Sequence, residues 1–304
     1  MIEFERVYKA YGDVLALRGA SFRIPRGALA GLLGPNGSGK TTSLKLMVGL
    51  IKPNAGLVSV NGYDPWVHED RVRELVGFLP ERPIYPSYLK VGSLLRHLAR
   101  LRGLPWSDAV RIARLVGIEK YLDTKIGGLS RGYLQRFGLA QALLGEPEIL
   151  LLDEPTANLD PHARMEILEL IAALKRDLNA TVLISSHILP ELQQVIDYVV
   201  LISGGRVVDY GPLGELSSKY RVTTVYVARS PKPRSVARLL IEHEHVSGVM
   251  LGDDWVEIHA DPGFGDELKR ILSELQADGL VSGFELKTGY LGELYERAIR
   301  AAEY

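Results

Sequence analysis

The sequence contains no cysteine, no long hydrophobic run and no excess of either charge. The absence of cysteine excludes disulfides, thiolate metal sites and cysteine nucleophiles, and it fits a reducing compartment. No apolar stretch approaches the roughly 20 residues that a membrane-spanning helix needs. We therefore expect a protein that is soluble by itself and that acts at a membrane only through a partner.

The charge balance argues against one class of partner. Lysine and arginine together number 36, aspartate and glutamate 37, and the net charge is -1. Dedicated nucleic-acid binders carry a basic excess, so we expect no nucleic acid among the partners. The length of 304 residues is large for one core and small for three, which favours one large and one small domain.

Apolar strand-like runs and helix-like segments alternate along the first two thirds of the chain, which predicts an α/β domain with a mixed sheet. The strongest strand signals lie at 28–34, 149–152 and 181–185, and the helix signals at 40–49 and 161–178. Residues from about 83 to 144 have helical periodicity and predict a helical subdomain within this domain.

The pattern changes near Gly204 and Gly205, and we place a domain boundary near residue 218, which gives a larger domain at 1–217 and a smaller accessory domain at 218–304. Residues 221–287 read as strand, helix, strand, strand, helix and strand, which predicts a small α+β domain of the ferredoxin-like type. An amphipathic helix is expected at about 291–302.

A phosphate-binding loop follows the first buried strand. It matches the pattern G-x-x-x-x-G-K-[ST] with Gly34, Pro35, Asn36, Gly37, Ser38, Gly39, Lys40 and Thr41. The glycines allow backbone amides to point at phosphate oxygens, and the start of the next helix attracts the same anion. We expect Lys40 to hold the β and γ phosphates, Thr41 to bind Mg²⁺, and Thr42 to complete the nucleotide site.

Two carboxylates end the apolar strand at 149–152. A buried parallel strand delivers Asp153 to the carboxyl edge of the sheet, where ligands of open α/β folds bind. Asp153 is expected to hold Mg²⁺, and Glu154 to orient and deprotonate an attacking water. With the phosphate loop, these residues predict binding and hydrolysis of a nucleoside triphosphate.

Residues 129–136, with the sequence LSRGYLQR, resemble the Leu-Ser-Gly-Gly-Gln signature of ATP-binding cassette (ABC) ATPases. The order of phosphate loop, signature, acidic strand, Asp160 and His187 also resembles that family, over roughly residues 1–217. The resemblance implies a P-loop NTPase fold, ATP and Mg²⁺ as cofactors, and a head-to-tail dimer with a second ATP-binding subunit, identical or different. It also implies a separate transmembrane permease subunit and a peripheral place on the cytoplasmic face of the cell membrane.

The resemblance assigns further roles. It implies that Ser130 and Gly132 contact the γ-phosphate of the ATP held by the second subunit, and that Tyr11 stacks on adenine. It implies that His187 contacts the γ-phosphate of its own ATP and positions the water. Asp160 would lie in the loop that links the two sites of the dimer.

Three positions depart from the family pattern. Arg131 and Tyr133 stand where the signature has Gly and Gln, and Glu81 stands where the family has Gln. A carboxylate can still serve Mg²⁺, so Glu81 is a predicted metal ligand. Leu-Pro-Glu at 79–81 and a C-terminal module of this size resemble the exporter branch, which moves drugs, polysaccharides and other small molecules.

Two other functions stay open at this point. The chain could be an ABC-type ATPase of nucleic-acid repair, translation or cluster assembly, although it has no long coiled-coil insertion, second cassette or basic excess. It could also be a regulatory ATP-binding module that has lost hydrolysis, although Lys40, Asp153, Glu154 and His187 are all present.

Overall fold

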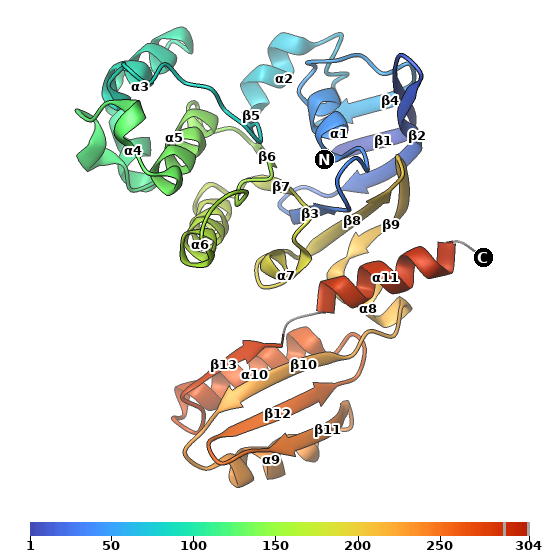
Figure 1. Cartoon of the computed structure of the whole chain (residues 1–304). Helices are drawn as coiled ribbons and strands as arrows, with labels where there is room; N and C mark the ends of the chain where they lie inside the picture. Colours follow the sequence, from blue (N-terminus) through green and yellow to red (C-terminus); the bar gives the residue numbers. More distant parts are fainter. Residues whose placement is uncertain (288–289, 303–304) are drawn as a thin grey trace. The chain divides into compact units, whose positions relative to one another are not determined.

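The computed structural model describes residues 1–287 and 290–302, and the chain separates into two compact units (Figure 1). The first comprises Met1–His187 and Tyr198–Asp209, and the second comprises Ile188–Asp197 with the described residues from Tyr210 onward. The domain boundary expected after residue 217 stays a prediction. Within the described residues, no helix is both long enough and apolar enough to cross a bilayer.

A six-stranded sheet in the order β5-β6-β7-β3-β8-β9 belongs to the first unit, except for the last residues of β9. Its strands are β3 (Leu29–Leu33), β5 (Val76–Leu79), β6 (Ile149–Asp153), β7 (Thr181–Ser186), β8 (Tyr198–Ser203) and β9 (Arg206–Pro212). The strands from β5 to β8 pair in parallel, and every residue of β3, β6 and β7 is buried. Because parallel strands end at the same edge, the loops after β3, β6 and β7 bring the predicted site residues together.

A smaller antiparallel sheet, β2-β1-β4, packs beside the first one. It consists of β1 (Ile2–Tyr11), β2 (Val14–Ile24) and β4 (Ala55–Val60). Helix α1 (Lys40–Met47) contacts both sheets, and a single apolar cluster joins Phe4 and Phe22 of the small sheet to Leu44 of α1 and Leu151 of β6. This shared core fixes the start of α1 against the sheet.

The segment expected to be helical holds α3 (Val91–Leu101), α4 (Trp106–Leu115) and α5 (Arg131–Leu143), which lie together in Figure 1. Helix α6 (Pro161–Leu178) follows β6. Helix α2 (Glu69–Leu75) was not expected from the sequence, because it buries only Val72 and so has almost no apolar periodicity.

The second unit contains a four-stranded antiparallel sheet in the order β11-β12-β10-β13. Its elements are β10 (Thr224–Arg229), α9 (Pro233–Ile241), β11 (Val246–Leu251), β12 (Trp255–Ala260), α10 (Gly265–Ala277) and β13 (Gly283–Leu286), in the order expected from the sequence. One apolar cluster holds alternate residues of β10 and β12 with both helices, so α9 and α10 cover the same face (Figure 1). The unit also contains α7 (Leu189–Leu192), α8 (Leu213–Lys219) and α11 (Tyr290–Ala302), and α11 contacts α7.

Candidate active site

The loop after β3 is tightly enclosed by its neighbours. A Cβ atom at Gly34 would lie 2.1 Å from the Ile202 carbonyl oxygen, and one at Gly39 would lie 2.8 Å from the Ala16 carbonyl oxygen. Gly39 also has a φ of 107°, which side chains disfavour, and it begins α1. Only glycine fits these two positions, so the spacing seen in the sequence reflects the space available to the loop.

Lys40 directs its ammonium group back into this loop. Its Nζ donates to the carbonyl oxygens of Gly34 at 2.8 Å and Pro35 at 3.2 Å, and lies 3.4 Å from Oε1 of Glu154. Only 6% of the Lys40 side chain and 9% of the Glu154 side chain are exposed. The positive charge of Lys40 therefore lies inside the loop, where solvent screens its interaction with Glu154 only weakly.

Asp153 ends β6 and is held by two hydroxyl groups. Thr41 Oγ1 and Ser185 Oγ donate to Asp153 Oδ1 at 3.2 and 2.6 Å. Burial raises the pKa of Asp153; these two hydrogen bonds lower it, and the negative charges of Glu154 and Glu81 raise it. Ser185 is a site residue that the sequence prediction missed. The feature that could have identified it is a serine near the end of an otherwise apolar strand.

Glu154 follows Asp153 and has a left-handed backbone, with a φ of 48°. Such a conformation is unfavourable for a side-chain-bearing residue and persists because neighbours hold it. The backbone nitrogen of Glu154 donates to Ser185 Oγ at 3.0 Å, and its Oε2 lies 2.9 Å from Nδ1 of His187. The structure thus brings Lys40, Glu154 and His187 together, although they come from three separate segments.

The signature residues lie at the start of α5. Ser130 caps this helix by accepting from the Tyr133 nitrogen at 3.4 Å, and Asp160 caps α6 by accepting from the Ala163 nitrogen at 3.0 Å. Ser130, Gly132 and Asp160 line one surface cavity of about 200 Å³. The backbone bond from Ala163 is the main cause of the lowered pKa of Asp160.

The departures from the signature make contacts of their own. Arg131 Nη1 donates to the Asn158 carbonyl oxygen at 3.3 Å, which joins the signature to the loop before α6. The Tyr133 ring lies 4.2 Å from that of Tyr121, centroid to centroid. Both residues therefore have a structural role within their own subunit.

Tyr11 and Glu81 are more open to solvent. Tyr11 ends β1 with an exposed ring, and Lys9 Nζ lies 5.3 Å from the ring centroid. Glu81 follows β5 and forms a 3.2 Å ion pair with Arg82, while its charge still reaches Asp153. An exposed aromatic face can stack on a base, and an exposed carboxylate can approach a metal.

The remaining polar groups fit ATP and Mg²⁺. Ser38 Oγ is buried in the loop and has no hydrogen-bond partner within the described residues, so it can serve a phosphate oxygen. Thr41 and Asp153 supply the oxygen ligands that Mg²⁺ prefers. In the part of the chain that the structure describes, no three acidic or histidine side chains gather as a metal site.

Comparisons with known proteins agree with this geometry. A family model described as ABC transporter matches residues 17–157. The uncharacterized ABC transporter ATP-binding protein YxlF of Bacillus subtilis is 32% identical over 312 residues, covering 99% of this chain and 100% of that protein. Nod factor export ATP-binding protein I of Burkholderia orbicola is 34% identical over 258 residues, covering 82% of this chain and 84% of that protein.

A solved structure of the ATP-binding subunit of an ABC transporter is 29% identical and covers 72% of this chain and 93% of its own, with a TM-score of 0.65. The ABC ATPase fold expected from the sequence is thereby confirmed for the nucleotide-binding part. Because YxlF matches from end to end, and the phosphate loop, acidic strand and signature occupy their expected elements, the chain belongs to the ABC transporter family as an ATP-binding subunit with ATPase activity.

Proposed function

We propose that this chain hydrolyses MgATP with Glu154 as the general base and thereby powers export through a separate permease. The observation that carries the proposal is the position of the Glu154 carboxylate, with one oxygen 3.4 Å from Lys40 Nζ and the other 2.9 Å from His187 Nδ1. A carboxylate fixed on both sides beside a phosphate loop can orient and deprotonate a water that attacks the γ-phosphate.

The other residues of the site bind and position. Lys40, Ser38 and the amides of the loop would hold the phosphates, and the exposed ring of Tyr11 would stack on adenine. Thr41 and Asp153, with Glu81, would hold Mg²⁺, which when bound neutralises charge on the phosphate oxygens. His187 would keep the Glu154 carboxylate and the water aligned.

A second ATP-binding subunit would complete each site in a head-to-tail dimer. The side chains of Ser130 and Asp160 accept hydrogen bonds from the first turns of their own helices, α5 and α6. Neither of these hydrogen bonds connects them to the site around Lys40. Ser130 and Gly132 stand at the start of α5, and helix starts attract phosphate oxygens. These features support the assignment of Ser130 and Gly132 to the ATP of the partner, with Asp160 between the two sites.

A groove in the first unit supports the docking of a permease segment. It has a volume of about 830 Å³ and is lined by side chains of α2, β5, α3 and α5, by residues next to them, and by Val48 and Leu50 after α1. Two of its leucines are exposed, Leu50 by 59% and Leu101 by 70%. Exposed apolar surface of this kind is typical of interaction sites. Such docking would keep the chain on the cytoplasmic face of the membrane.

The direction of transport rests on the resemblance to the exporter branch and on the relative named for Nod factor export. The ATPase half of the proposal is tested by phosphate release from MgATP. Lys40→Ala should abolish release, whereas Lys45→Ala, on the exposed side of the same helix α1, should retain it. Equal release by the Lys40→Ala variant would refute the assignment of the loop.

A further inference from the structure

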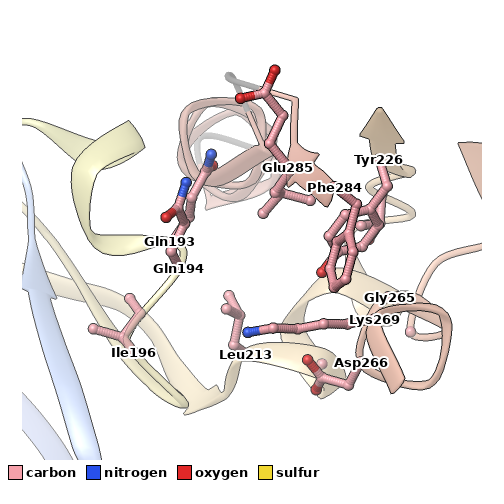
Figure 2. Close-up of a pocket in the computed structure, with 14 residues that line it drawn as sticks. Gln193, Gln194, Ile196, Leu213, Tyr226, Gly265, Asp266, Lys269, Phe284 and Glu285 are labelled. Atoms are coloured by element: carbon pink, nitrogen blue, oxygen red, sulfur yellow. The ribbon is translucent and has the colours of Figure 1, made fainter. Parts of the chain in front are cut away.

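The second unit contains a cavity that the ATPase function does not use. It has a volume of about 260 Å³ and lies among the segment 193–196, the start of α8, the start of α10 and strands β10 and β13 (Figure 2). Ligand pockets for drug-sized molecules span roughly 300–1,000 Å³, so this cavity suits a smaller molecule. All of its walls belong to one compact unit.

Two buried polar atoms in its walls have no protein partner. Gln193 Oε1 and Thr224 Oγ1 lack a hydrogen bond within the described residues, and only 6% of Gln193 and 3% of Thr224 are exposed. An unpartnered buried oxygen is unfavourable relative to a bonded one, so such atoms mark places where a ligand or water bonds. The amide oxygen of Gln193 accepts only, which requires an N–H or O–H group on the ligand.

Charges of both signs surround the same space. The side chain of Lys269 extends from α10 toward Leu213, with Asp266 one turn earlier on the helix, whereas the carboxylate of Glu285 on β13 points away from them (Figure 2). Within the described residues, neither Lys269 nor Asp266 has an ion pair. The ammonium of Lys269 can therefore bind a carboxylate, and the carboxylate of Asp266 can bind a cationic group.

The remaining walls set the shape and the apolar part of the site. Tyr226 and Phe284 pack edge to face, with 5.9 Å between their centroids, and Leu213 lies across from them (Figure 2). A Cβ atom at Gly265 would come within 2.7 Å of Thr224 Oγ1, so glycine at this position gives access to the hydroxyl group. Gly265 also begins α10, whose first turn has no side-chain cap and so presents open backbone donors.

We propose that this cavity binds a small zwitterion with an apolar side chain, the chemistry of a free apolar amino acid. Lys269, the Thr224 hydroxyl and the start of α10 bind its carboxylate, and Gln193 Oε1, with Asp266, accepts from its ammonium group. The side chain of the ligand packs on Phe284, Tyr226 and Leu213. This site is independent of the ATP site, because none of its residues takes part in the proposed hydrolysis.

The test is isothermal titration of the full chain with L-leucine, L-methionine and L-phenylalanine, each added alone. At least one should bind at a single site. For that amino acid, the carboxamide analogue, which lacks the carboxylate, and the deaminated acid, which lacks the ammonium group, should each bind at least about tenfold more weakly. No saturable binding of any of the three, or equal binding of either analogue, would overturn the proposal.

Variants locate the site. Lys269→Met should weaken binding at least about tenfold, and Thr224→Val should weaken it as well. Lys232→Met, an exposed lysine of the same unit that does not line the cavity, should leave binding unchanged. Because Lys269 is exposed, its variant should fold and keep full ATP turnover, which separates this test from that of the ATPase site. Binding by Lys269→Met that equals the wild type would place the ligand elsewhere.

Discussion

Lys40 and Glu154 form an ion pair in the interior of the site, with 3.4 Å between Nζ and Oε1. Removing one partner of a buried ion pair leaves an uncompensated charge in the protein interior, which is strongly destabilising. Each of the two side chains therefore holds the other in place. Glu154 is further fixed by His187 on its other oxygen and by Ser185 at its backbone nitrogen. The acidic end of β6 and the phosphate loop are thus connected by side-chain contacts as well as by the sheet.

Asp153→Asn should make the protein more stable at neutral pH and abolish Mg²⁺-dependent turnover. Because the pKa of Asp153 is raised by burial, its ionised form is less favourable in the folded chain than in the unfolded one. Stability is therefore lost as pH rises from the ordinary aspartate pKa through the raised one. The amide still accepts hydrogen bonds from Ser185 and Thr41 but carries no charge.

Thermal unfolding as a function of pH measures this effect. The melting temperature of Asp153→Asn should exceed that of the wild type at neutral pH, and the two should converge below the ordinary pKa of aspartate. Asp278→Asn, an exposed carboxylate in the second unit, serves as the control and should change little. A melting temperature of Asp153→Asn below that of the wild type at neutral pH would show that the ionised Asp153 carboxylate does not destabilise the folded chain.

Glu81→Gln, which restores the residue usual in the family, should shift the acid limb of turnover to lower pH. The negative charge of Glu81 contributes to the raised pKa of Asp153, so its removal lowers that pKa and keeps Asp153 ionised in more acidic solution. The measurement is MgATP turnover against pH, with Glu74→Gln as the control. An acid limb that stays in place would show that Glu81 does not act on Asp153.

Ser185→Ala should have the opposite effect on pH dependence and should also destabilise the fold. It removes the 2.6 Å hydrogen bond to Asp153 and one of the two acceptors of the Glu154 nitrogen, which keeps its 3.2 Å bond to the Ser185 carbonyl oxygen. Loss of a hydrogen bond to a buried charged group costs about 1.5–3 kcal/mol in the free energy of unfolding. The pKa of Asp153 should rise further, so the acid limb moves to higher pH. Ser282→Ala, which loses an exposed bond to a carbonyl, is the matched control.

The elements that the sequence predicts well are those with a local signal. Strands β3, β6 and β7 contain apolar runs, followed by the phosphate loop after β3, an aspartate at the end of β6 and two serines at the end of β7. The phosphate loop itself is recognised from the spacing of its glycines. The contact of Ser185 with Asp153 arises instead from the pairing register of β6 and β7, where these two residues are direct partners. Register between distant strands has no local signature, and neither has the contact of Arg131 at the start of α5 with Asn158 in the loop before α6, which depends on how the two segments pack.

Leu101→Asp should separate docking from catalysis. A carboxylate placed in the exposed apolar groove should prevent a permease segment from binding there, while the isolated chain keeps its ATP turnover. The measurement is the share of the chain that sediments with membranes from cells that make its permease. Leu239→Asp, an exposed leucine on α9, should remain membrane-associated. If Leu101→Asp sediments with membranes as the wild type does, the permease does not dock in this groove.

The role of Glu154 as general base is tested with the Glu154→Gln variant by measuring phosphate release and light scattering with MgATP. We expect turnover to fall at least about 100-fold, as for loss of a general base. The affinity for ATP should be at least as high as in the wild type, because Glu154 no longer competes for Lys40, and an ATP-dependent dimer should persist. Wild-type turnover by this variant, or a chain that binds MgATP yet stays monomeric, would show that Glu154 is not the general base of a dimeric ATPase.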